Sequence, residues 1–186
     1  MSITTKQGDR GETGRFGGGR IAKTDPRICA VGAIDELNSA IGLFSARPDV
    51  PAEVRSLIKR IQETCFVIGS HLSVTPSAPD GVYERIPRLG KEDITFLERE
   101  IERMEATTSV QRHFILPGGS PAASMCFWIR SVVRRAERDL FKAHAIEPLD
   151  EHILAFMNRM SDFWYALGRY LNHLSGTEEV EWQGSN

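Results

Sequence analysis

Apolar residues recur every three or four positions along five stretches of the chain. This is the spacing of an amphipathic helix, whose apolar side chains share one face. The stretches cover about 25–46, 51–72, 91–106, 121–143 and 149–175. No segment alternates between apolar and polar residues as a strand does, and most of the connections between the five stretches are short. The pattern therefore predicts an all-α protein, a five-helix up-and-down bundle.

Residues that favour helix ends flank these stretches. Asp25 and Ser120 each precede a proline, which places a capping side chain before a residue suited to the first helical turn. Gly176 follows the fifth stretch and can end a helix in the left-handed conformation. Residues 75–90 carry three prolines and two glycines, and they predict a long loop between the second and third helices.

The segment before the first helix, residues 5–23, has a different composition. It reads TKQGDRGETGRFGGGRIAK, with six glycines between positions 8 and 20 and five lysines or arginines. Because it has almost no apolar residues, we expect neither a strand nor an amphipathic helix here. Glycine lets backbone N–H groups approach a ligand closely, and such groups together with cations suit a polyphosphate. A mobile N-terminal tail is equally consistent with the composition.

Four charged residues of the fourth helix share one face, at offsets of four, seven and eight from the first of them. They are Arg130, Arg134, Glu137 and Arg138. Three arginines around one glutamate leave a positive charge, which suits an anion or an acidic patch on a neighbouring chain. A solvated surface with weak ion pairs is the competing interpretation.

Polar residues also interrupt the apolar pattern of two other helices. On the fifth helix, Asn158, Asp162 and Arg169 share one face, where a carboxylate surrounded by apolar residues would need a partner. On the first helix, Asp35 and Glu36 are adjacent and point about 100° apart, so they are not a paired acid–base site. Salt bridging is the role that we expect for Asp35.

Composition narrows the class of protein. The net charge is −2, which argues against a dedicated nucleic-acid binder. No apolar run approaches the length that spans a bilayer, and the N-terminus lacks the apolar region of a secretory signal. The three cysteines lie far apart without a CxxC spacing, which indicates a reducing environment. We therefore expect a cytoplasmic protein without a membrane or nucleic-acid partner, and no metal site built from side chains.

Five motifs in one order carry a family resemblance. They are TKQGDRGETGRFGGGRIAKTDPR, AVGAIDELNSAIGL, FILPGGSPAA, RSVVRRAER and NRMSD. Together they span nearly the whole chain, and in this order they resemble the ATP:cob(I)alamin adenosyltransferases of the PduO type. The resemblance implies a five-helix bundle that forms a homotrimer with active sites between subunits. It also implies that cob(I)alamin attacks the 5′-carbon of ATP, that triphosphate leaves, and that Mg²⁺ accompanies the phosphates.

The resemblance implies roles for individual residues. The expected ATP contacts are Thr5, Lys6, Gly8, Thr13, Gly14, Lys23, Arg134, Glu137, Arg138 and Asn158. Lys23 and Arg134 would face phosphate charge, and Glu137 and Asn158 would position the ribose or base. Asp162 is expected to orient an arginine rather than to move a proton, since the displacement needs no general base.

Other residues are implied in cobalamin binding and in assembly. Phe114 matches an aromatic residue that lies under the corrin and excludes its lower axial base, although from sequence alone an ordinary apolar residue before a helix is the simpler interpretation. Trp182 resembles a late aromatic residue that closes over the corrin. Asp35 and Arg130 match an ion pair between subunits. The chain departs from the family at Phe127, where a histidine is common.

The expected layout is one domain over 1–186, with a phosphate-binding loop at 1–24, the bundle at 25–175 and a C-terminal tail at 176–186. A corrinoid or ATP-binding chaperone or sensor without turnover is the alternative to the enzyme, and a purely structural bundle is the third possibility. A reductase and an adenosylcobalamin-dependent acceptor enzyme are possible partners of the enzyme.

Overall fold

A computed structural model describes residue 6 and residues 8–76 and 78–184. Most of this length is helical, in agreement with the predicted bundle. The elements in chain order are β1 (Glu12–Gly14), β2 (Arg20–Ala22), α1 (Pro26–Ser45), α2 (Ala52–Ser73), the 3₁₀ turn η1 (Tyr83–Arg85), α3 (Lys91–Glu105), α4 (Pro121–Ile146) and α5 (Glu151–Leu174).

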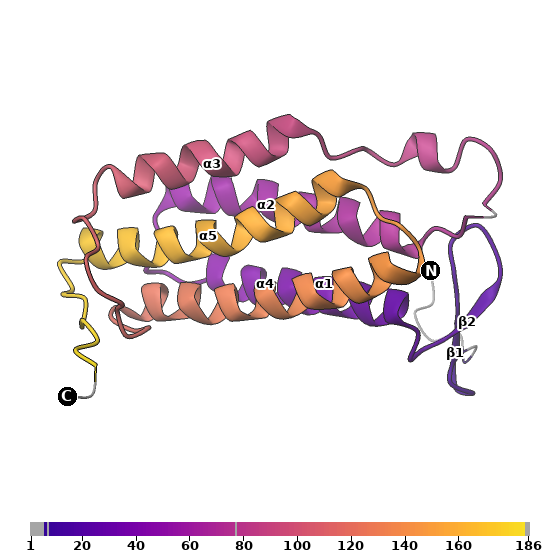
Figure 1. Ribbon diagram of the computed structural model, residues 1–186, viewed down its shortest axis with the longest axis horizontal. Helices are drawn as coiled ribbons and strands as arrows, with labels where there is room; N and C mark the ends of the chain where they lie inside the picture. The colour runs from indigo at the N-terminus through magenta and orange to yellow at the C-terminus, as the bar shows by residue number, and fades with distance from the viewer. Residues whose placement is uncertain (1–5, 7, 77, 185–186) are drawn as a thin grey trace.

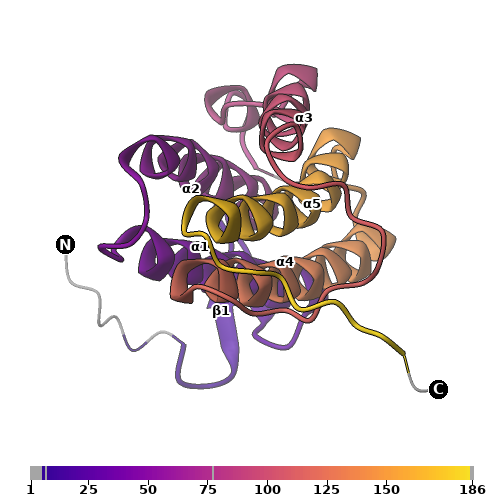
Figure 2. The same ribbon diagram turned by 90° about the vertical axis from the view of Figure 1, so that its left-hand side faces the viewer.

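The five α-helices lie side by side and alternate in direction along the chain, as expected for an up-and-down bundle (Figure 1). α4 packs against both α1 and α5, α2 lies against α1, and α3 lies against α5. The end-on view in Figure 2 shows α3 on the outside, next to α5. The small sheet and the C-terminal tail lie at opposite ends of the bundle (Figure 1).

The predicted helix ends are confirmed, with one extension. The Asp25 side chain accepts a hydrogen bond from the backbone N–H of Arg27 at 2.8 Å. Ser120 Oγ accepts from the N–H of Ala123 at 3.2 Å, and Gly176 adopts a φ of 64° after α5. Helix α4 continues to Ile146, three residues beyond the predicted end, and the chain then turns over residues 147–150 into α5.

The prediction that residues 5–23 contain no strand was wrong. β1 and β2 pair in antiparallel register, with Thr13 opposite Ile21. The turn between the strands uses three consecutive glycines with φ of 96°, 111° and 82°, a conformation that other residues rarely adopt. Three-residue strands bury too little surface to need an alternating pattern, so hydropathy alone could not reveal them.

The core is apolar and centred on large side chains of α1 and α5. Trp164 is fully buried and meets the Phe44 ring edge-on, with 5.2 Å between ring centroids. α1 is the one helix in the described ranges whose length and hydropathy would suffice to cross a membrane. The length and hydropathy of α1 contradict the prediction that no apolar run approaches that length. The buried positions of α1 pack inside the bundle, against α2 and α4.

Candidate functional site

The glycine-rich segment is fixed to the end of α2. The N–H of Phe16 donates to the carbonyl of Ser73 at 3.0 Å, and the N–H of Thr75 donates to the carbonyl of Phe16 at 3.0 Å. A Cβ on Gly17 would lie 3.0 Å from the Cα of Ala78, so the glycine also permits a close approach of two backbones. The described part of the segment is therefore not a free tail.

Glu147 ties this segment to two helices. Its carboxylate lies 3.1 Å from Nη1 of Arg15 and 3.1 Å from Nη2 of Arg27, the latter in the first turn of α1. Arg27 also donates to the backbone carbonyls of His71 and Leu72 at the end of α2. Burial lowers the pKa of Arg27, and the nearby Glu147 carboxylate opposes that effect. The carboxylate thus compensates buried positive charge where α1, α2 and α4 meet the glycine-rich segment.

Several of the predicted ATP-binding residues lie together in the hairpin. Lys23 follows β2, its N–H donates to the carbonyl of Gly11 at 2.9 Å, and its Nζ would lie 3.0 Å from a Cβ placed on Gly8. Thr13 and Gly14 form most of β1. Lys6 is exposed with a φ of 56°, and Thr5 lies outside the described residues.

The cations of the hairpin divide into two groups. Arg15 pairs with Glu147, and Arg20 pairs with Glu12 at 3.0 Å. Among the residues that the structure describes, Lys6, Arg10 and Lys23 have no carboxylate within ion-pair distance. The second group is the one whose charge is available to an anion.

The arginine face of α4 is present as predicted. Arg138 Nη1 donates to the carbonyl of Arg134 at 2.9 Å, and Arg130 lies 5.3 Å from the centre of the Tyr165 ring. None of the three arginines of this face, Arg130 included, pairs with a carboxylate in the described part of the chain. Arg135, by contrast, points elsewhere and forms an ion pair with Glu36. The face therefore carries positive charge that the described part of the chain does not neutralise.

The polar residues of α5 lie beside this face. Asn158 Nδ2 donates to Glu137 Oε1 at 3.1 Å, which joins two of the predicted ATP contacts. Asp162 is exposed and forms an ion pair with Arg159 at 3.0 Å, one turn earlier on the same helix. Arg169, although on the same face as these residues by spacing, is buried because other parts of the chain cover that part of α5.

Asp35 and Arg130 do not pair within the chain. Asp35 is exposed and has no ion pair among the described residues. It lines a pocket of about 420 Å³ together with Phe66 and Asn38, and the buried Oδ1 of Asn38 has no hydrogen-bond partner in the described chain. The Nε of Arg130 is buried and has no hydrogen-bond partner in the described chain. Both residues are therefore left with capacity for a partner.

Phe114 and Trp182 meet at the opposite end of the bundle. Their ring centroids lie 6.4 Å apart, and the N–H of Trp182 donates to the carbonyl of Phe114 at 2.7 Å. The two residues remain 74% and 54% exposed. They line a cavity of about 550 Å³ together with residues 111–113 and 183–184. The structure thus brings together the two residues that were predicted to contact cobalamin.

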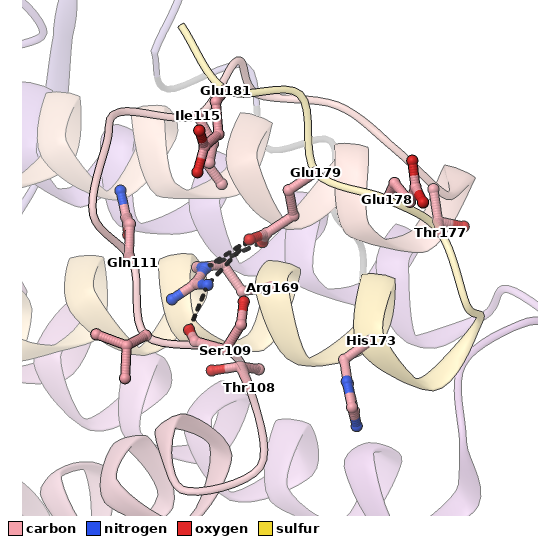
Figure 3. A pocket seen from close by; sticks show the side chains of 11 residues that line it. Thr108, Ser109, Gln111, Ile115, Arg169, His173, Thr177, Glu178, Glu179 and Glu181 are labelled. Carbon is pink, nitrogen blue, oxygen red and sulfur yellow. Dashed lines mark hydrogen bonds and ion pairs between the residues drawn. The ribbon is translucent and has the colours of Figure 1, made fainter.

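Sequence reasoning missed two charged contacts that hold these ends in place. One is the contact of Glu147 with Arg15 and Arg27, and the other joins buried Arg169 to Glu179 in the tail (Figure 3). A glutamate in a connection and an arginine within an apolar helix carry no signal of their partner. Within the described ranges, no three side chains of His, Cys, Asp or Glu gather as metal ligands do.

These features define a five-helix bundle with cations in the hairpin and on α4 that have no carboxylate partner among the described residues, and with an exposed aromatic pair at the end opposite the hairpin. The sequence profile of the cobalamin adenosyltransferase family matches residues 3–171. The chain therefore belongs to the cobalamin adenosyltransferase family, which confirms the resemblance drawn from its motifs.

Individual relatives agree over the full length. A cobalamin adenosyltransferase of Cupriavidus metallidurans is 38% identical over 181 residues, which cover 97% of this chain and 94% of the relative. A corrinoid adenosyltransferase of Bacillus subtilis is 37% identical, with coverage of 100% and 94%. A variant PduO-type ATP:corrinoid adenosyltransferase from Lactobacillus reuteri, complexed with cobalamin and ATP, superposes with a TM-score of 0.91 at 29% identity, over 98% of this chain and 100% of that one.

Proposed function

We propose that this chain transfers the 5′-deoxyadenosyl group of ATP to cob(I)alamin, with ATP contacts in the hairpin and along α4 and α5, and cobalamin contacts at Phe114 and Trp182. In this reaction the cobalt of cob(I)alamin forms a bond to the 5′-carbon, the bond from that carbon to the phosphate oxygen breaks, and the electron pair leaves with triphosphate. The products are adenosylcobalamin and triphosphate. The observation that carries the proposal is the arginine face of α4, which has no carboxylate partner among the described residues.

On the ATP side, charge on the leaving group sets the barrier. Cations placed where that charge develops stabilise the transition state. We assign Lys23 and Arg134 to the phosphates, with Arg138 beside them. Glu137 and Asn158 already contact each other, and we assign them to the ribose or base, which both carry hydrogen-bonding groups. Thr5, Lys6, Gly8, Thr13 and Gly14 complete the proposed ATP site.

We propose that Mg²⁺ enters this site together with ATP. The described residues offer no group of three metal-ligating side chains, and Mg²⁺ commonly keeps several waters and binds substrate phosphates. We therefore propose that the phosphates hold the ion, which would neutralise part of the leaving-group charge.

On the cobalamin side, we propose that Phe114 lies under the corrin and that Trp182 closes over it. An aromatic ring below the cobalt leaves no room for the lower axial base. Loss of that donor lowers the orbital that accepts an electron and eases reduction to Co(I). The two rings are exposed and flank one cavity, which supports this assignment.

Assembly as a homotrimer is the second part of the proposal. The hairpin and the C-terminal tail lie at opposite ends of the bundle (Figure 1). Asp35 and Arg130 have no ion-pair partner among the described residues, and the buried Nε of Arg130 has no hydrogen-bond partner there. We propose that neighbouring subunits supply these partners, with Asp35 of one pairing with Arg130 of the next, so that each active site lies between two subunits.

We also propose a cytoplasmic location for the protein. We propose that its single domain is divided into a phosphate-binding loop at 1–24, a bundle at 25–175 and a tail at 176–186. We propose a reductase that supplies Co(I) and an adenosylcobalamin-dependent acceptor enzyme as partners.

The experiment combines the protein with ATP, Mg²⁺ and chemically reduced cob(I)alamin. We expect light-sensitive adenosylcobalamin and one triphosphate for each cobalamin consumed. Binding of both substrates without product would favour the chaperone or sensor instead. A melting temperature that neither substrate raises would favour the purely structural bundle, because a ligand that binds the folded state stabilises it.

A further inference from the structure

We propose that Arg169 and Glu179 are positioning residues that hold the C-terminal tail, residues 177–184, in place to bind cobalamin. The inference rests on the proposed function, because it takes Trp182 to be a cobalamin contact. It then explains which contacts hold Trp182 in place. Neither residue is proposed to touch the substrate.

The contact is a two-pronged ion pair with almost no exposure. Arg169 Nε and Nη2 each lie 2.9 Å from a carboxylate oxygen of Glu179, a geometry that fixes both groups (Figure 3). Only 8% of the Arg169 side chain and 18% of the Glu179 side chain are exposed. Water therefore screens this pair much less than it screens a surface pair.

Arg169 also reaches the connection between α3 and α4. Its Nη2 donates to the carbonyl of Ser109 at 2.9 Å, five residues before Phe114. A single guanidinium of α5 thus holds both segments that carry the aromatic pair: the connection that leads to Phe114 and the tail that leads to Trp182. Figure 3 shows the tail and the connection on either side of Arg169.

Beyond the ion pair, the tail runs antiparallel to the segment that contains Phe114. The N–H of Leu116 donates to the carbonyl of Val180 at 2.8 Å, and the N–H of Trp182 donates to the carbonyl of Phe114 at 2.7 Å. Glu179 directly precedes this ladder, so the ion pair sets where the ladder begins. A tail displaced at Glu179 would lose its register against Phe114.

The exposure of the two rings distinguishes this arrangement from ordinary core packing. A tail that served only stability would bury its aromatic residue, yet the residues Phe114 and Trp182 stay 74% and 54% exposed. The backbone is fixed while the apolar surface faces a cavity of about 550 Å³. Exposed apolar groups held in a defined place are typical of a binding surface.

The ligand class follows from the proposed function: a broad, flat corrin ring. If only a fraction of molecules has the tail docked, the apparent affinity for cobalamin falls by that fraction. The proposed ATP contacts lie in the hairpin and on α4 and α5, and none of them is a residue of the tail. Loss of the ion pair should therefore weaken cobalamin binding selectively.

The test compares Glu179→Gln with Glu178→Gln in the full-length chain. The two changes remove the same charge from neighbouring residues, but Glu178 has no partner among the described residues and points away from Arg169 in Figure 3. We expect Glu179→Gln to raise the KM for cob(I)alamin on the order of tenfold, for a tail docked about a tenth of the time, with the KM for ATP unchanged. Glu178→Gln should match the unmodified protein.

A second variant guards against a folding defect. Arg169→Lys keeps the charge but cannot form the two-pronged contact, so it should raise the same KM. In each variant the melting temperature is measured alongside the two KM values. Equal changes in both KM values, or no change in the KM for cobalamin, would overturn the inference. The unmodified protein reports separately on the proposed function: if it turns over normally while Glu179→Gln has no effect, only the ion-pair assignment fails.

Discussion

The carboxylate of Glu147 lies 3.1 Å from the guanidinium of Arg15, across 132 positions of sequence. The same carboxylate compensates the buried Arg27, whose pKa burial lowers. The connection between α4 and α5 therefore helps to fix the glycine-rich hairpin that carries the proposed phosphate contacts.

Replacing Glu147 with glutamine should destabilise the protein and disturb the hairpin. The change leaves two buried arginines without a carboxylate, and hydrogen bonds to charged groups contribute about 1.5–3 kcal/mol each. We expect a loss of that order in the free energy of unfolding, measured with urea. We also expect the variant to have a higher KM for ATP than the unmodified protein has.

The control is Glu63→Gln, which removes a pair with Lys59 whose side chains are 66% and 79% exposed. Such pairs contribute about 0.2–1 kcal/mol at most. Equal losses in the two variants would show that Glu147 has no special role.

Arg134→Ala should lower turnover far more than Arg135→Ala. Arg134 has no carboxylate partner in the described chain, whereas Arg135 pairs with Glu36. Removing one group that stabilises developing charge commonly costs about 10²–10³ in rate. Initial rates of adenosylcobalamin formation test this. If Arg134→Ala keeps full activity, Arg134 does not face the triphosphate.

Exchanging the charges at Asp35 and Arg130 tests the proposed contact between subunits. Asp35→Arg alone and Arg130→Asp alone should each weaken assembly by about 2 kcal/mol or more, because a charge loses its partner at an interface. The double variant should recover the trimer in sedimentation velocity. An unmodified protein that sediments as a monomer at micromolar concentration would refute shared active sites.

Gly119→Ala should disrupt the turn between Phe114 and α4. Gly119 has a φ of 106°, and an added Cβ would collide with the side-chain amide of Asn172. Asn172 is buried, and its Oδ1 accepts a hydrogen bond from the N–H of Ser120 at 2.9 Å. Because the site can relax little, we expect a loss of about 2 kcal/mol or more in the free energy of unfolding.

Gly176→Ala is the matched control for that change. Gly176 also has a positive φ, 64°, but open space surrounds its Cβ position. It should lose only the backbone term of about 1–2 kcal/mol. Thermal unfolding of both variants separates steric collision from conformational strain, and an equal loss would remove the role given to Asn172.

The helices and their ends could be predicted because their signals come from residues that are close together in the sequence. Apolar spacing marks the faces of α1 to α5, and Asp25 and Ser120 mark starting points through contacts only two or three residues away. The arginine face of α4 followed from helical geometry in the same way. Family motifs then indicated ATP and cobalamin, which spacing alone could not.

Contacts between distant residues could not be predicted. The hairpin depends on glycine conformations and on docking to α2, neither of which produces a hydropathy pattern. Arg169 was recognised as a charge on an apolar helix, but its partner Glu179 is one of three glutamates in a polar tail. Only the folded chain shows which of these carboxylates pairs with Arg169.

The placement of the hairpin and the aromatic pair at opposite ends has a consequence for mixed assemblies. If neighbouring subunits share each catalytic centre, a chain with Lys23→Ala and a chain with Phe114→Ala are each inactive as homotrimers. Mixed trimers of the two would contain some centres that draw an intact hairpin from one chain and an intact aromatic pair from the other. Two inactive proteins, unfolded together and refolded as a mixture, should therefore recover part of the activity by complementation between subunits.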